Sequence, residues 1–240
     1  MSRPTNSWGR WWSGYVRSRD AARLARYQPA HAPRLRLATR IALWLHVCVL
    51  LFLFSAFLSV VLAQAIPRDA QRHQLTLKRE AQHTWGLGAP VATFAAQVHQ
   101  ESRWRESAHS QVGAVGLAQF MPSTSNWIGG LYSSLGDRSP TNPVWALRAL
   151  VTYDKWLADR ITAADACERM AFTLSAYNGG LGWVYKRQKI SLLPGLCLDH
   201  TCKLNPGVTP GSQAENQHYP EVILHKFEPL YSSWGNGSCA

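Results

Sequence analysis

The feature that most limits how this chain can fold is a long stretch without any fixed charge. Between Arg40 and Arg68 there is no Asp, Glu, Lys or Arg, and Ile41–Leu62 consists mainly of Leu, Val, Phe and Ala. As a helix, some 22 residues span roughly 33 Å, enough to cross the hydrocarbon core of a membrane. We therefore expect a transmembrane anchor over residues 41–66.

The charge before this stretch sets the expected orientation. Residues 1–40 hold nine arginines and one acid, Asp20, so this basic leader carries +8 of the chain's formal +11. A basic segment before an apolar run stays in the cytoplasm, and the chain after it is exported. This predicts a single-pass membrane protein with a cytoplasmic N-terminus and its body outside the cytoplasm. Because the body is nearly balanced in charge, we expect no nucleic-acid partner.

A cleaved signal peptide is the alternative to an anchor. Ala63-Gln64-Ala65 has the small-x-small form of a cleavage site, although the apolar run and its leader are both long for a signal peptide. Both alternatives place the rest of the chain outside the cytoplasm. Residues 67–87 are expected to form a stalk or a first exported helix, and residues 88–240 the globular domain with a cysteine-containing C-terminal region.

The cysteines agree with export. Four lie after the apolar run, an even number that suits an oxidising compartment: Cys167, Cys197, Cys202 and Cys239. A local disulfide between Cys197 and Cys202 is one of three pairings that remain open. A zinc site from Cys197, His200 and Cys202 is the weaker alternative, because its spacing fits no strong zinc pattern. We expect no metal and no cofactor.

The body is expected to be mainly helical, since no alternating strand pattern of useful length occurs. The expected helix starts are near Pro90, Pro122, Asn142-Pro143 and Ala164. Gly179-Gly180 should end the helix that starts near Ala164. Residues 191–218 are rich in Pro, Gly and Cys and are expected to be an ordered loop region, with a last helix over residues 221–231.

An acid stands on the apolar side of the first of these helices. Apolar residues recur from Val91 to Val98 at the spacing of one helical face, and Glu101 and Ser102 extend that face by one turn. Such a carboxyl is either a paired buried charge or an acid whose pKa is raised by burial. An acid of the second kind can hold its proton near neutral pH and deliver it to a substrate.

A second polar pair ends the helix that starts near Ala164. Tyr177 and Asn178 follow its apolar stripe, as Glu101 follows the earlier one. Two helices packed by these stripes would bring the polar ends into one cleft. Tyrosine hydroxyl and asparagine amide groups offer a buried carboxyl hydrogen bonds without a neutralising charge, an environment that suits a proton donor.

Three motifs together, in order and spacing, resemble the soluble lytic transglycosylase family, which shares its fold with goose-type lysozyme. They are Glu101-Ser102, Gly116-Leu117-Ala118-Gln119 and Ala176-Tyr177-Asn178. The resemblance covers about residues 85–190. It implies a lysozyme-like domain that cleaves the β-1,4 bond between N-acetylmuramic acid and N-acetylglucosamine in peptidoglycan. It also implies that Glu101 is first the general acid and then the base toward the muramic 6-hydroxyl, which gives a 1,6-anhydro product.

The resemblance also implies roles for the other motif residues. Ser102, Gln119, Tyr177 and Asn178 match positions that orient the acid and hold the sugars. The family usually has Met where this chain has Ala118, so we expect one sugar subsite to differ in shape. Family members often serve a larger machine, such as a secretion or conjugation apparatus or a phage lysis programme.

The residues themselves bear on the mechanism. Ordinary glycosidases need two carboxylates, but Glu106 and Asp137 are weak candidates for the second one, because each lies in a loop or turn. Attack by the substrate's own hydroxyl is therefore the more economical mechanism. The alternatives are a goose-type muramidase that uses water and a non-catalytic wall-binding or assembly component.

Overall fold

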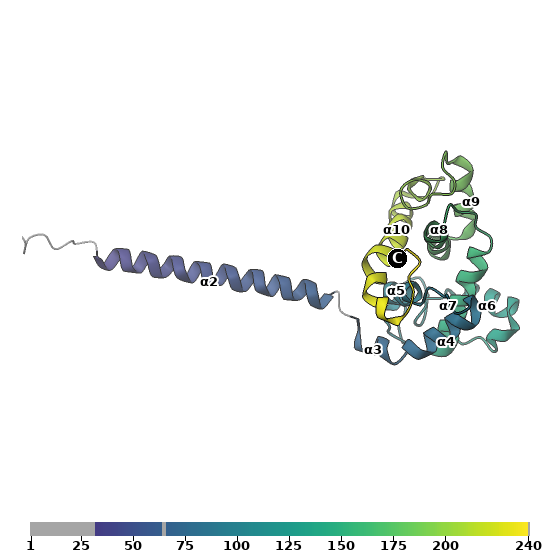
Figure 1. The fold of residues 1–240 in the computed structure, drawn as a ribbon, viewed down its shortest axis with the longest axis horizontal. Coiled ribbons are helices and arrows are strands. Elements are labelled where there is room, and N and C mark those ends of the chain that lie inside the picture. Colours follow the sequence, from purple (N-terminus) through teal and green to yellow (C-terminus); the bar gives the residue numbers. More distant parts are fainter. Residues whose placement is uncertain (1–31, 64–65, 240) are drawn as a thin grey trace, which may run out of the picture. The chain divides into compact units, whose positions relative to one another are not determined.

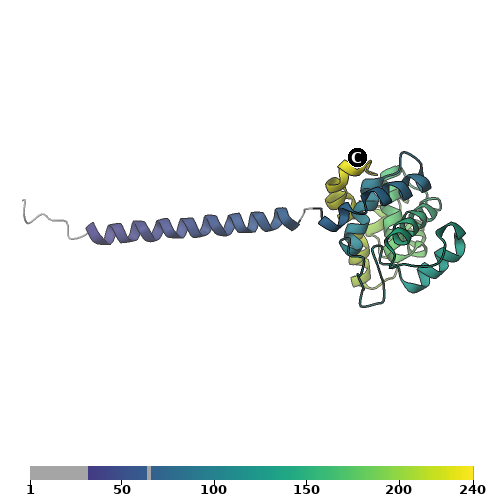
Figure 2. The same ribbon diagram turned by 90° about the horizontal axis from the view of Figure 1, so that it is seen from below.

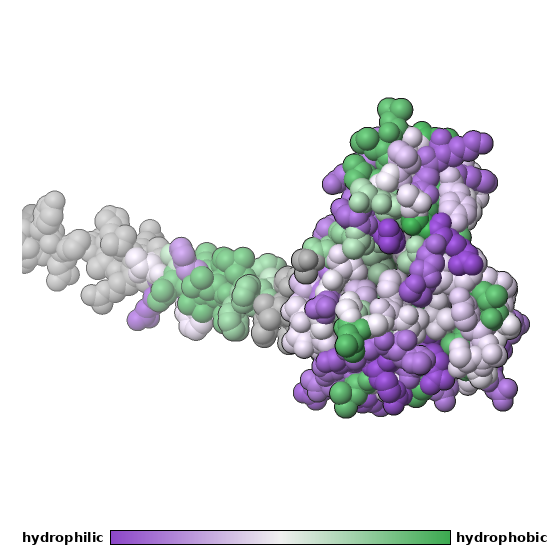
Figure 3. Space-filling model, turned by 45° about the vertical axis from the view of Figure 1, so that its right-hand side comes forward, coloured by the Kyte–Doolittle hydropathy of each residue, from purple (hydrophilic) through white to green (hydrophobic). Residues whose placement is uncertain are grey.

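A computed structural model describes residues 32–63 and 66–239, with only the backbone course for 32–38 and 58–63. The long helix α2 (Ala32–Ala63) is a unit of its own. Its segment Thr39–Phe57 is long and apolar enough to cross a membrane by length and composition, and its exposed side chains are largely hydrophobic (Figure 3). The expected leader lies mostly outside the described residues, as do positions 64 and 65 of the small-x-small motif.

The second unit is the globular domain (Figures 1 and 2). Its elements are α3 (Arg68–Gln71), α4 (Gln74–Trp85), α5 (Val91–Ser102), α6 (Pro122–Leu131), η1 (Ser133–Leu135), α7 (Pro143–Ala158), α8 (Ala166–Gly179), α9 (Leu181–Ile190), η2 (Thr201–Lys203), α10 (Pro210–Glu221), η3 (Val222–Phe227) and η4 (Glu228–Trp234). Within the described ranges, extended pairing is limited to isolated bridges in the loop after α5. The predicted mainly helical class is confirmed.

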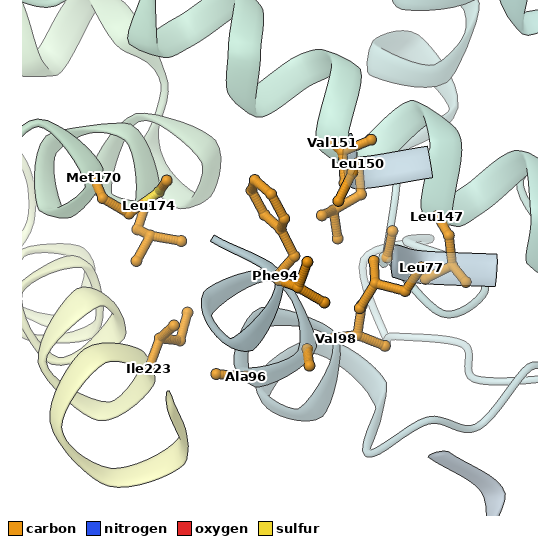
Figure 4. Close-up of a cluster of buried hydrophobic side chains, with 14 of the residues drawn as sticks. Leu77, Phe94, Ala96, Val98, Leu147, Leu150, Val151, Met170, Leu174 and Ile223 are labelled. Atoms are coloured by element: carbon orange, nitrogen blue, oxygen red, sulfur yellow. The ribbon is translucent and has the colours of Figure 1, made fainter. Parts of the chain in front are cut away.

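Helix α5 is the central element of the domain. Every residue from Val91 to His99 is buried, so this helix is enclosed on all sides, unlike an amphipathic surface helix. Figure 4 shows Phe94 and Val98 of α5 among side chains of neighbouring helices, including Leu150 of α7 and Leu174 of α8. The apolar stripe identified from the sequence is therefore one part of a helix that is buried all round.

Local sequence explains several helix ends. The Asn142 side chain accepts hydrogen bonds from the backbone N–H groups of Val144 and Trp145 at 2.9 and 3.2 Å, which caps α7 as predicted. Helix α8 is capped by Asp165 and ends at Gly180, whose φ is 99°. The start of α5 differs slightly from expectation, since Pro90 is its N-cap rather than its first residue.

The C-terminal third contains more helix than the sequence predicts. Residues 191–218, expected as a loop region, include η2 and most of α10, and the last helix expected over 221–231 is instead a π-helix followed by a 3₁₀-helix. Helix α9 was also not predicted. The reason is visible in α10, whose buried residues include no aliphatic side chain at helical spacing: they are Gln213, Asn216, Tyr219 and Pro220.

The sequence allowed two interpretations of residues 67–87, a stalk or a first exported helix. In the structure these residues include the helices α3 and α4. Helix α4 packs against α5 and α7, and its Leu77 and Ala81 are fully buried. This segment is therefore part of the domain's core packing.

Two disulfides join the four cysteines of the domain. Cys197 pairs with Cys202, and Cys167 in the first turn of α8 pairs with Cys239 near the C-terminus. Because the sulfurs of Cys197 and Cys202 are bonded to each other, the alternative zinc site is wrong. The free Cys48 is exposed on α2.

Candidate active site

The candidate acid lies where α5 stops. Arg103 adopts a left-handed conformation, with φ 51°, and its N–H bonds to the carbonyl of His99, which ends the helix directly after Ser102. Glu101 is thereby held in the last turn of a buried helix, and the residue is itself partly buried.

A cleft of about 260 Å³ opens at this helix end. Four of the five predicted site residues line it, namely Glu101, Gln119, Tyr177 and Asn178. Helix α6 and the residue before it add Thr124 and Met121, and α7 adds Tyr153. The structure therefore brings together side chains from α5, the Gly116 loop and α8, as the sequence motifs predicted.

The carboxyl of Glu101 holds its proton to an unusually high pH. Burial raises its pKa from 4.5 to about 8, and the negative charge of Glu215 acts in the same direction. A hydrogen bond donated by the Tyr219 hydroxyl to Glu101 Oε1 opposes this shift without cancelling it. Among the described residues, no cation forms an ion pair with Glu101. It is therefore an uncharged acid at neutral pH.

The tyrosine that contacts Glu101 is not the predicted one. Tyr177 lines the cleft, but its hydroxyl donates to the carbonyl of Ala118 at 2.7 Å. Burial, and then the charge of Glu101, raise the pKa of Tyr177 well above 10. Sequence reasoning missed Tyr219 because it belongs to α10, which has no apolar period.

The loop that carries Gln119 has a constrained backbone. Gln119 has φ 46°, and its side-chain amide donates to the carbonyls of Gly116 and Ala108 at 2.9 and 3.2 Å. Gly116 has φ 77°, and a Cβ there would lie 2.1 Å from the carbonyl oxygen of Pro140, so only glycine fits. These bonds fix the amide nitrogen of a side chain that lines the cleft.

Asn178 belongs to a polar network that joins α8, α9 and α10. Its Oδ1 accepts from Asn216 at 2.9 Å, and its Nδ2 donates to Glu215 at 3.3 Å. Asn216 also accepts from the buried Arg187 at 2.8 Å. A Cβ at Gly179 would lie 2.6 Å from Asn216 Nδ2, so this glycine permits the close approach of α8 and α10. The network fixes α10, and with it Tyr219, against the cleft.

Ser102 and Ala118 lie behind the cleft wall. Ser102 is 1% exposed, and its hydroxyl donates to the carbonyl of Val98 at 3.4 Å. Ala118 is fully buried, while its carbonyl holds Tyr177. Neither is among the residues that line the cleft, so a direct sugar contact by Ser102 stays a prediction from the resemblance.

The other carboxyls separate into two groups. Glu106 contacts His73 Nε2 at 3.1 Å, and Asp137 is exposed in its turn; neither lines the cleft. Asp154 of α7, by contrast, is fully buried, and the charge of Glu101 adds to the effect of burial in raising its pKa. The periodicity argument that identified Glu101 also applies to Asp154, since it shares a helical face with Leu147, Leu150 and Leu157. In the described part of the chain, no cluster of three or more His, Cys, Asp or Glu could hold a metal.

Comparison with known proteins agrees with this geometry. Residues 76–191 match the family model described as the transglycosylase SLT domain. Two curated relatives are each described as membrane-bound lytic murein transglycosylase F. The one from Shewanella pealeana is 26% identical over 134 residues, covering 55% of this chain and 26% of the relative. The one from Maricaulis maris is 32% identical over 99 residues, covering 41% and 20%.

A solved structure has the same fold. An inactive glutamate-to-glutamine mutant of lytic transglycosylase Slt from Pseudomonas aeruginosa matches with a TM-score of 0.53 at 23% identity, covering 67% of this chain and 24% of that one. The chain thus spans about a quarter or less of the length of these proteins. The predicted family resemblance and the lysozyme-like fold are confirmed.

Proposed function

Because residues 76–191 form a transglycosylase SLT domain, we propose that this chain is a peptidoglycan lytic transglycosylase. Its substrate would be the β-1,4 bond between N-acetylmuramic acid and N-acetylglucosamine, with a 1,6-anhydro end as the product. Glu101 would be the group that carries the proton.

One observation carries this proposal: an uncharged carboxyl faces a polar cleft. A general acid works best when its pKa lies near the operating pH, and burial raises the pKa of Glu101 to about 8. Its hydrogen bond from Tyr219 is with a neutral group, so the carboxyl is oriented but is not held as a carboxylate.

The proposed reaction uses Glu101 twice. Its proton passes to the glycosidic oxygen as the bond from that oxygen to the muramic C1 breaks. The carboxylate then takes the proton of the muramic 6-hydroxyl, whose oxygen bonds to C1 and closes the anhydro ring. Glu101 ends in its starting form. Of the described residues that line the cleft, Glu101 is the only one with a carboxyl group, which supports a single-acid mechanism over one with two carboxylates.

The surrounding side chains have proposed roles that follow from their bonds. The Gln119 amide oxygen and the Asn178 side chain would hold polar groups of the sugars. Tyr177, held by Ala118, would form a wall of the cleft. Ser102 would act from behind by supporting the turn that carries Glu101. Service to a secretion, conjugation or lysis machine stays a prediction from the resemblance.

The chain's location is also a proposal. We propose that α2 anchors the protein in the inner membrane, with residues 1–40 in the cytoplasm and the domain in the periplasm. The span Thr39–Phe57, the arginine-rich sequence before it and the relatives' description as membrane-bound support this arrangement. The two disulfides suit an oxidising compartment. N-terminal sequencing of the mature protein separates an uncleaved anchor from a processed signal peptide.

The proposal is tested by digesting purified peptidoglycan with the wild-type chain and with Glu101→Gln. Removing a general acid should reduce cutting by at least about 100-fold. Glu106→Gln is the matched control, because Glu106 pairs with His73 and does not line the cleft. It should cut as the wild type does.

Mass analysis of the fragments decides the reaction type. Anhydro ends are expected; reducing ends would instead establish a muramidase that uses water. Binding to peptidoglycan without any cutting would identify a non-catalytic wall component. Equal clearing by Glu101→Gln and wild type on a zymogram would refute the assignment of the acid.

A further inference from the structure

A second buried carboxyl lies behind the cleft and has no role in the reaction above. Asp154 of α7 and Gln97 of α5 are both fully buried, and Gln97 Nε2 donates to Asp154 Oδ1 at 3.4 Å. Gln97 precedes Glu101 by four residues, so the two lie on the same face of α5, one turn apart. The contact of Asp154 with Gln97 therefore reaches the turn that carries the acid.

The remaining oxygens of this pair do not have protein partners. Gln97 Oε1 and Asp154 Oδ2 are both buried without a hydrogen bond. If Asp154 were ionised, both atoms would be acceptors only, and neither could satisfy the other. A proton on Oδ2 turns that atom into a donor for Oε1. The pair can then close as a cyclic acid–amide arrangement with two hydrogen bonds, which leaves no polar atom of either terminal group unpaired.

The ionisable groups around Asp154 favour the same state. The titratable groups that act on it or are acted on by it are Glu101, Tyr153, Tyr177 and Tyr219, all acids. Within the described residues, no cation forms an ion pair with Asp154. Burial, and then the charge of Glu101, raise its pKa well above 3.8, while the bond from Gln97 opposes this.

We propose that Asp154 is a protonated carboxylic acid that pairs with Gln97 and thereby positions Glu101. This rests on the proposed function, since the acid that it positions is the proposed general acid. Asp154 is a positioning residue, because it acts through α5 and does not line the cleft. A neutral Asp154 also leaves Glu101 as the one carboxyl of the two that gains and loses charge during the reaction.

Infrared spectroscopy tests the protonation state without any use of activity. The difference between wild type and Asp154→Asn at pH 7 should contain the carbonyl stretch of a protonated carboxylic acid. The same difference taken in a Glu101→Gln background removes the contribution of Glu101 and should keep this band. A carboxylate band in its place, as expected if Asp154 is ionised beside a bound water, would overturn the proposal.

Kinetics test the positioning role. Asp154→Asn can still pair with Gln97 amide to amide, so kcat should fall by no more than about threefold. The alkaline limit of activity, which is the pH above which kcat declines, should not move. Gln97→Leu leaves Asp154 without its partner and should reduce kcat by about tenfold or more with little change in KM. Thr173→Val is the matched control, since Thr173 is a fully buried polar residue outside the cleft. It should leave both parameters unchanged.

Two kinetic outcomes would contradict the proposal. If Asp154→Asn lowers the alkaline limit by about one pH unit, then Asp154 is charged and was raising the pKa of Glu101. If Gln97→Leu loses no more kcat than Thr173→Val, then the pair does not position Glu101. If the wild type cuts no glycan, the proposed function fails, while the infrared band still decides whether Asp154 and Gln97 form the pair.

Discussion

Two glutamates lie on the apolar sides of two helices in this domain, and their surroundings drive them to opposite charge states. Glu80 on α4 is 4% exposed and accepts hydrogen bonds from Arg79 and Arg148 at 3.0 and 2.8 Å. Burial alone would raise its pKa, but the two arginines outweigh burial and lower it. Glu101 has a tyrosine hydroxyl in place of a cation, and its pKa rises to about 8.

The comparison shows that the partner, more than burial, decides what a buried glutamate can do. A carboxylate that is paired with arginines cannot donate a proton at neutral pH, whereas a carboxyl among hydroxyl and amide groups can. Cavity size does not distinguish the candidate active site from the surroundings of Glu80. The pocket that Glu80 lines is about 520 Å³, larger than the cleft of about 260 Å³ beside Glu101.

The largest expected loss of folding stability comes from breaking the Glu80 ion pair. Glu80→Gln should lower the free energy of unfolding by about 1 to 2 kcal/mol, because both arginines lose their buried carboxylate partner, while solvent partly screens the Arg148 side chain, which is 36% exposed. Urea unfolding at pH 7 measures this. Cutting per folded molecule should stay at the wild-type level, since Glu80 does not line the cleft.

A double variant sharpens this prediction. Glu80→Gln combined with Arg148→Met should lose less stability than the sum of the single changes, because the second removes the unpaired charge. If Glu80→Gln left stability unaltered and abolished cutting, the contrast between the two glutamates would be wrong.

The sequence could predict this contrast only in part. The spacing of apolar residues placed Glu101 at the end of a buried helix. It left open whether its carboxyl is paired with a cation or has a pKa raised by burial. That question depends on residues far away in the chain: Tyr219 follows Glu101 by 118 positions and Arg148 follows Glu80 by 68. Sequence spacing on a single helix contains no information about such partners.

The predictable parts of the fold are the helices that have apolar residues at helical spacing or a capping residue at an end. The helix after Asn142 and the glycine end of α8 were predicted because each depends on a few adjacent residues. Helix α10 was missed, since it is held by Gln213, Asn216 and Arg187, whose mutual hydrogen bonds form only after α8, α9 and α10 have packed. The missing tyrosine of the site belongs to this helix.

The uncharged state of Glu101 should be visible in the pH dependence of stability. Its folded-state pKa of about 8 lies above the ordinary 4.5. Between these values the folded state keeps a proton that the unfolded state releases, so wild-type stability falls as pH rises through this range. Glu101→Gln cannot undergo this loss, so at pH 9 it should be more stable than wild type, by up to about 1.4 kcal/mol for each unit of the pKa shift.

Thermal or urea unfolding at several pH values measures that difference. It should shrink to nearly zero at pH 4, where both states of the wild type are protonated. A difference that is constant with pH would mean that Glu101 titrates normally in the folded state.

His99 offers a test of the same principle with the opposite sign. It lies on α5 two residues before Glu101, and burial, then the charges of Arg103 and Lys226, lower its pKa from 6.5 to about 4. Its contribution to stability is complete above pH 6.5 and is lost as pH falls toward 4. This loss should be absent in His99→Gln; in the wild type it amounts to up to about 1.4 kcal/mol for each unit of the pKa shift. Parallel pH dependences for variant and wild type would contradict this.

The smallest effect concerns the hydroxyl that distinguishes Glu101 from Glu80. The hydrogen bond from Tyr219 lowers the pKa of Glu101, so Tyr219→Phe should raise that pKa further and move the alkaline limit of activity upward by about half a unit, or about 0.7 kcal/mol. The pH profile of kcat measures this shift.

Tyr231→Phe is the matched control, because Tyr231 is a buried tyrosine that bonds to His99 and Trp104. It should cost stability and leave the limit in place. If Tyr219→Phe moved the limit downward, the hydroxyl would be stabilising the neutral carboxyl, and the state of Glu101 would depend on that bond more than on burial.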